Sequence, residues 1–204
     1  MSGSAGNKFN TAVGYGSGDS VTTADSLTLI GGQTGQAITT GNDNTAVGYL
    51  SLNQLETSGS NTAVGHMAGY HTMGNSNTYI GEGAGYSGAD ADHGSKNVAV
   101  GRGSMYYGDN INNSVAIGYN SLLNGDANTS ETVAIGYGSA WFATGSYNTF
   151  VGSEAGKGGT TSAPFSSGQY NTAIGYNTMA GMTSAVSNTA VGVSALEDIT
   201  TATS

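Results

Sequence analysis

The chain has 204 residues, of which four are Lys or Arg and thirteen are Asp or Glu, so its formal net charge is −9. This balance argues against a nucleic-acid-binding protein, because such proteins need clustered basic residues to neutralise phosphates. The chain contains no cysteine, which excludes disulfides and leaves the redox compartment unreadable from the sequence.

The chain divides into three parts by composition. Residues 1–6 form an N-terminal segment with no basic region and no apolar core, so we do not expect a signal peptide, and no apolar stretch long enough to span a membrane follows. Residues 7–199 form a single repeat domain, and residues 200–204 form a polar C-terminal tail. We therefore expect a protein made in the cytoplasm and not inserted into a membrane.

The repeat domain is defined by a glycine that follows a Val or Ile in every unit. Successive glycines are separated by 16 to 23 residues, most often by 17. They are Gly14, Gly31, Gly48, Gly65, Gly81, Gly101, Gly118, Gly136, Gly152, Gly175 and Gly192. A period of this kind that runs from end to end indicates one supersecondary unit stacked on itself, and it lowers the prior probability of an enzyme.

The three residues before each repeat glycine alternate between a Thr or Val, a mostly small residue, and a Val or Ile. Alternation with period two in β-branched residues predicts a strand, with the β-branched pair on one face and the middle residue, usually Ala, on the other. The predicted strands are residues 11–13, 28–30, 45–47, 62–64, 78–80, 98–100, 115–117, 133–135, 149–151, 172–174 and 189–191. We expect the units to pair in parallel at about 4.8 Å per turn, giving a rod of roughly 50 Å.

Each unit also predicts two corners and a second short segment. Eight units carry an Asn four places before the glycine, and Asn favours turns and tolerates left-handed backbone. The repeat glycine permits the second corner. Three places after it the residue is always small, which predicts a second short strand or bend facing a tight interior. The remaining residues of each unit are expected to form a return loop that leads to the next strand.

A turn this short predicts a thin interior of Ala, Ser and Gly. Such an interior buries little apolar area against a backbone entropy cost of roughly 1–2 kcal/mol per residue, so a lone rod would be marginally stable. The Ala column is expected to press against copies of the chain, and threefold closure is the simplest arrangement. We therefore expect a homotrimer.

Several units resemble a known family. The runs 114–118 and 132–136, each followed three residues later by Ser, are similar to the head repeats of trimeric autotransporter adhesins, the YadA-like head family. The run 61–69 resembles repeats of bacteriophage tail fibres. The resemblance covers about residues 7–199 and implies an all-β fold, a left-handed parallel β-roll of about 11 turns of about 17 residues, assembled as a trimer. The turns here are longer than the most compact repeats of that family, so the return loops must project.

Aromatic residues form two sets that are candidates for contact with a receptor. Tyr follows the repeat glycine in five units, and a second set lies five or six places after it. Both sets could instead pack within or between chains. The candidate receptor contacts are Tyr106, Tyr107, Trp141 and Phe142, together with Asp90, Asp92, His93 and Phe165 in the extended return loops 85–97 and 153–170. Loops of this kind vary without disturbing a ladder, so we expect specificity there.

The sequence predicts no catalytic, cofactor or metal site. The acidic residues Glu56, Glu82, Glu131 and Glu154 lie in different units and do not form the carboxylate pair of a glycosidase. Three or four converging zinc ligands are not apparent among the scattered His residues. A calcium ion held by Asp90, Asp92 and His93 is conceivable, but the ligand count is low.

These features together favour a non-enzymatic structural or receptor-binding protein of a bacteriophage virion, most simply a trimeric tail-fibre component. Its expected partners are its own copies, other virion proteins and a host surface glycan or protein, with no nucleic acid and no cofactor. One alternative is a capsid decoration protein, and another is the head of a bacterial surface adhesin. Ice binding by a Thr ladder is disfavoured, because Thr alternates with Val and is expected to face inward.

Overall fold

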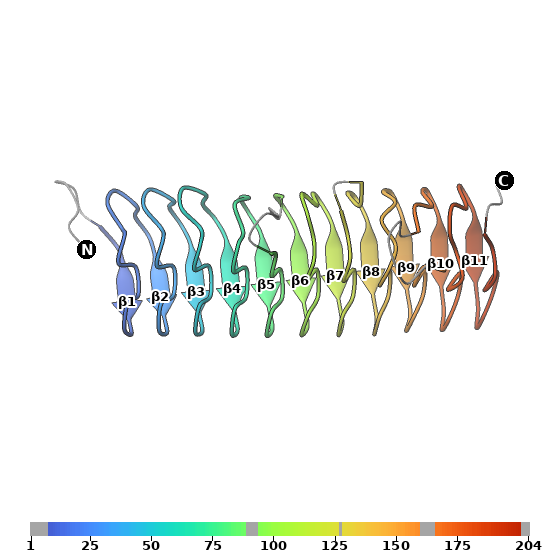
Figure 1. The fold of residues 1–204 in the computed structure, drawn as a ribbon, viewed down its shortest axis with the longest axis horizontal. Helices are drawn as coiled ribbons and strands as arrows, with labels where there is room; N and C mark the ends of the chain where they lie inside the picture. Colours follow the sequence, from blue (N-terminus) through green and yellow to red (C-terminus); the bar gives the residue numbers. More distant parts are fainter. Residues whose placement is uncertain (1–7, 89–93, 127, 160–165, 201–204) are drawn as a thin grey trace.

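A computed structural model describes residues 8–88, 94–126, 128–159 and 166–200, and these residues form an all-β solenoid without a helix (Figure 1). Every predicted strand is present at the predicted residues. The strands are β1 (Thr11–Val13), β2 (Thr28–Ile30), β3 (Thr45–Val47), β4 (Thr62–Val64), β5 (Thr78–Ile80), β6 (Val98–Val100), β7 (Val115–Ile117), β8 (Val133–Ile135), β9 (Thr149–Val151), β10 (Thr172–Ile174) and β11 (Thr189–Val191).

The strands form one parallel sheet in chain order, from β1 to β11. Neighbouring units are in register, so that Thr45 lies beside Thr62 and Val47 lies beside Val64. Figure 1 shows the strands side by side in a row, with the two ends of the chain at opposite ends of the rod. Ten steps of about 4.8 Å between the eleven strands correspond to a rod of about 50 Å.

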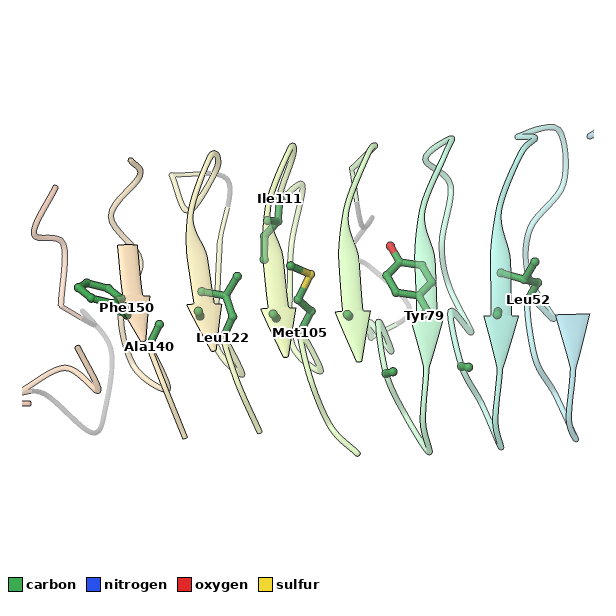
Figure 2. Packing of buried hydrophobic residues seen from close by; sticks show 14 of the residues in the cluster. Leu52, Tyr79, Met105, Ile111, Leu122, Ala140 and Phe150 are labelled. Atoms are coloured by element: carbon green, nitrogen blue, oxygen red, sulfur yellow. The ribbon is translucent and has the colours of Figure 1, made fainter. Parts of the chain in front are cut away.

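The middle residue of each strand points into the solenoid, which corrects the expectation that the Ala column packs against another copy. Ala46, Ala63 and Ala116 are fully buried within the single chain, and so are the larger Tyr79 and Phe150 at the same position (Figure 2). Because these side chains are enclosed by their own chain, they cannot form the contact surface of a trimer.

The interior is also larger than the thin core that we expected. Apolar side chains outside the strands fill the space that the Ala column leaves, and Figure 2 shows Leu52, Met105 and Leu122 lying across the core. Ile111 enters from the return loop and is completely buried. Since each buried side chain of this size stabilises the fold by about 1.5–3 kcal/mol, the core of the single chain is more substantial than the Ala, Ser and Gly pattern suggested.

The segment after each repeat glycine is not a second strand. Its backbone alternates in handedness, with positive φ two and four residues after the glycine, as at Leu50 (59°) and Leu52 (46°). It is nevertheless held by hydrogen bonds between turns, because Leu50 N–H donates to Gly32 and Leu52 N–H donates to Ala68. The small residue between them, Ser51, is buried as expected.

The β-branched columns face outward, which corrects the expectation that the Thr column faces inward. In most strands the first residue is half-buried and the middle one is buried, while the last is half-buried or exposed. Seven members of the Val/Ile column have exposed fractions between 37% and 68%, including Val64, Ile80 and Ile117. We call this outward side of the sheet, made by the first and last residues of β1–β11, the strand face.

Candidate functional site

A groove of about 320 Å³ lies beside the sheet in the middle of the rod. It is built from segments that follow the repeat glycines after β4, β5, β6 and β7, and no strand residue contributes to it (Figure 1). Its lining residues are His66, Met67, Glu82, Gly83, Tyr86, Arg102, Gly103, Tyr106, Tyr107, Tyr119, Asn120 and Leu123.

The floor of the groove exists because two consecutive units lack a side chain at one position. Two residues after the repeat glycine, the four units carry Met67, Gly83, Gly103 and Asn120. The glycines therefore form a gap in this column, with Met67 at one end and Asn120 at the other. A Cβ atom at Gly83 would lie 2.7 Å from Cε2 of Tyr106, so the ring of Tyr106 packs directly on this glycine.

One wall of the groove is a stack of tyrosine rings five residues after the repeat glycine. Tyr70 stacks on Tyr86 at 5.6 Å between ring centroids, and Tyr86 stacks on Tyr106 at 4.6 Å. Tyr107 meets Tyr106 edge to face at 4.8 Å and is 58% exposed. Burial, together with the neighbouring phenol of Tyr86, raises the pKa of Tyr106, so this ring stays a neutral phenol at neutral pH.

The opposite wall carries a charged pair and a further ring, all one residue after the repeat glycine. Arg102 Nε donates to Glu82 Oε2 at 3.1 Å, and Arg102 Nη1 donates to the hydroxyl of Tyr119 at 3.1 Å. The guanidinium carbon also lies 5.6 Å from the centroid of the Tyr119 ring. The hydrogen bond with Glu82 raises the pKa of Arg102, which keeps the guanidinium charged.

Rings also stack in other units at the same position, one residue after the repeat glycine. Tyr119 stacks on Tyr137 at 5.6 Å with nearly parallel planes, and Tyr49 stacks on His66 at 5.8 Å. The register of the turns therefore places rings that are 17 or 18 residues apart in sequence one above another. The result is an aromatic strip along one edge of the rod.

The structure brings only some of the predicted contact residues together. Tyr106 and Tyr107 line the groove. Trp141 and Phe142 do not line the groove. They stack at 5.7 Å, and Trp141 lies 6.1 Å from the ring of Tyr137, which in turn stacks on Tyr119 of the groove wall. The remaining predicted residues lie outside the described part of the chain; these are Asp90, Asp92, His93 and Phe165.

Sequence reasoning missed the polar half of the groove. Glu82 appeared only as a scattered acidic residue, while Gly83, Arg102 and Asn120 were not identified as candidates. Aligning the units on the repeat glycine gives the missing signal, because Gly83 and Gly103 then fall in one column beside the opposite charges of Glu82 and Arg102.

In the described parts of the chain, no three His, Asp or Glu side chains converge in the manner of a metal site. The same residues form no helix with the length and apolar character needed to cross a bilayer. Comparisons of the chain with protein-family models, with curated proteins and with solved structures gave no match. The resemblance to YadA-like head repeats therefore stays a prediction based on the repeat itself.

Proposed function

We propose that the chain is a non-enzymatic structural and receptor-binding protein, working as a homotrimer in a bacteriophage tail fibre. In this proposal the solenoid is a left-handed β-roll located in the virion. Its partners are two further copies, other virion proteins and a glycan or protein on the host surface. The alternatives are a capsid decoration protein and the head of a bacterial surface adhesin, and both would use the same rod.

The strand face is the observation that carries the proposal. Its Val and Ile side chains run the length of the sheet, although the core of the chain is already complete without them. A long row of partly exposed Val and Ile side chains, beside a row that is mostly Thr, supports an interaction site along the sheet. Three rods around a common axis would cover all three strand faces in a closed, symmetric assembly.

The groove supports a binding role over a catalytic one. Glu82 is the only carboxylate among its described lining residues, and Arg102 engages it directly. Glycoside hydrolysis uses two carboxylates that flank the scissile bond. Three identical rods would present three such grooves, so weak contacts would combine through effective concentration.

The oligomeric state tests the first part of the proposal. Light scattering on the purified chain should give about three times the monomer mass of 20.2 kDa. Replacing Ile80 and Ile117 together by Asp should give a folded monomer, because the charges would be buried in the trimer interface but exposed in the single rod. Met73→Asp, at an exposed apolar residue outside the strand face, should leave the trimer intact. A monomeric unmodified chain would contradict the proposal.

The position of the chain in an assembled particle tests the second part. Gold-labelled antibodies against the chain should mark the tail fibres of virions in electron micrographs. Label on the capsid shell would replace the tail-fibre assignment with a decoration protein. Label on bacterial cells that carry no phage would replace it with a surface adhesin.

A further inference from the structure

We propose that the groove between Glu82 and Leu123 binds a neutral saccharide, with one sugar ring lying on the tyrosine wall. This inference rests on the proposed receptor-binding function and names the chemical class of the receptor. It is argued from three properties of the groove, which are its shape, its aromatic surface and its balance of charge.

The shape of the groove suits an extended oligosaccharide. Its volume of about 320 Å³ falls at the lower end of the range of about 300–1,000 Å³ that small-molecule sites occupy. Its lining residues come from four successive turns, which span about 14 Å along the rod at the spacing of parallel strands. The groove is therefore longer than one sugar ring and follows the axis of the rod.

The aromatic wall matches one side of a pyranose ring. A sugar ring presents a face of C–H groups, and aromatic side chains provide large, rigid contact area for such a face at low entropic cost. Tyr106 and Tyr107 meet nearly at a right angle, and Tyr107 and Tyr119 are both substantially exposed. The rings thus border a corner in which a ring-shaped ligand contacts more than one tyrosine.

The polar groups of the groove match the hydroxyl rim of a sugar. Arg102 uses two of its five N–H donors in the hydrogen bonds to Glu82 and Tyr119. Glu82 retains acceptor capacity at its carboxylate. The amide of Asn120 adds a donor and an acceptor at the end of the groove. Adjacent sugar hydroxyls both donate and accept hydrogen bonds, so a sugar site needs donors and acceptors close together.

The charges favour a neutral sugar over an acidic one. Arg102 and Glu82 form an ion pair in the groove, and their opposite charges cancel. The whole chain carries a net charge of −9, and an anionic polysaccharide would approach it against this field. A polyanion receptor would need an excess of basic groups that this groove does not have.

Two groove variants and one matched control test the proposal. Gly103→Asn places a side chain on the floor of the groove. The backbone accepts it, because Asn120 and Asn177 have positive φ at the same position of their units. A Cβ atom there would lie 2.4 Å from Oδ1 of Asn120, at the flexible end of that side chain, and 3.9 Å from Cδ1 of Leu123. Tyr107→Ala removes an exposed ring without touching the core. The control is Tyr176→Ala, which removes an equally exposed ring, 56% exposed against 58% for Tyr107, in the unit after β10 and outside the groove lining.

The probes are neutral trisaccharides of glucose, galactose, mannose and N-acetylglucosamine, and the same set with one glucuronic or sialic acid unit. Binding is measured by saturation-transfer NMR and calorimetry on the folded trimer. We expect at least one neutral trisaccharide to bind, and we expect both groove variants to weaken its binding at least tenfold while the control changes it less than twofold. Binding of none of the neutral probes, preference for the acidic probes, or unchanged binding by both groove variants would overturn the proposal.

Host-cell binding separates this inference from the proposed function. If trimers bind host cells and the groove variants bind them equally well, the groove is not the receptor site, although the receptor-binding function stands. If the unmodified chain is a monomer that binds no cells, the proposed function itself fails.

Discussion

At the residue scale, the repeat glycines determine how closely the turns stack. All eleven have φ between 125° and 141°, a conformation that other residues rarely adopt. A Cβ atom at Gly65 would also lie 2.5 Å from the carbonyl oxygen of Gly81 in the next turn. The same position is therefore constrained twice, by its own backbone and by the neighbouring turn.

The two constraints can be separated by experiment. Gly65→Ala should lower the free energy of unfolding by about 3 kcal/mol or more, because it combines backbone strain with overlap against Gly81. Gly192→Ala should cost at least about 1 kcal/mol less, since φ there is 128° but no atom lies within 4 Å of the added Cβ. Chemical denaturation followed by circular dichroism measures both values. Equal losses would show that stacking does not contribute.

At the element scale, a buried ladder of Asn side chains joins the turns beside the strands. Asn61 Nδ2 donates to the carbonyl of Gly74 in the next turn at 3.1 Å, and its Oδ1 accepts from the N–H of Asn77 at 2.9 Å. The expected corner is present, but the left-handed residue is the one before Asn, for example Ser60 with φ of 61°. The Asn side chain satisfies buried backbone groups, which is a different role from turn formation.

Removing one amide from this ladder should be costly. Asn61→Ala should lower the free energy of unfolding by about 2–4 kcal/mol, because it leaves the Gly74 carbonyl and the Asn77 N–H buried without these partners. Asn61→Ser should cost about 1 kcal/mol less, since Ser114 holds the same position in its unit and its Oγ still accepts from Thr132 N–H at 3.1 Å. Thermal denaturation compares the variants. A serine variant as unstable as the alanine variant would contradict this role of the ladder.

At the scale of the whole molecule, the rod is nearly one-dimensional. Each strand pairs only with the strands before and after it, and each turn is held by its two neighbours. Stability in such a protein is approximately a sum of turn energies and interface energies between adjacent turns. A complete turn is therefore a removable unit, provided that the register of the ladders is kept.

Deleting residues 45–61 tests this additivity. The deletion removes one 17-residue unit and joins Asn44 to Thr62, which restores the Asn-Thr-Ala-Val-Gly run. The shortened chain should fold with β-sheet circular dichroism and a rod shorter by about 4.8 Å, measurable by small-angle X-ray scattering. Deleting only residues 49–56 shifts every following column and should abolish cooperative unfolding. Similar behaviour of the two deletions would contradict a register-dependent stack.

The sequence predicted the parts of the fold that depend on periodicity. Strand positions, parallel order and register followed from recurrence alone, because identical residues at a fixed spacing can only stack on their own copies. Recurrence did not predict which face of the strands points into the solenoid. Alternation separates Ala46 from Thr45 and Val47, but it does not say which side is enclosed, and small size suggested a close contact between chains. In the structure Ala46 is fully enclosed, and larger side chains such as Leu52 belong to the same core.

By itself, then, the sequence determined a one-dimensional property of this protein, the column to which each residue belongs. The tertiary structure decided how the columns sit around the turn, and this brought Tyr106 and Arg102 into one groove with Gly83 and Gly103. The handedness of the backbone after each repeat glycine sets that arrangement, and it depends on hydrogen bonds between turns that no single unit contains. A groove made from four turns exists only once those turns are stacked.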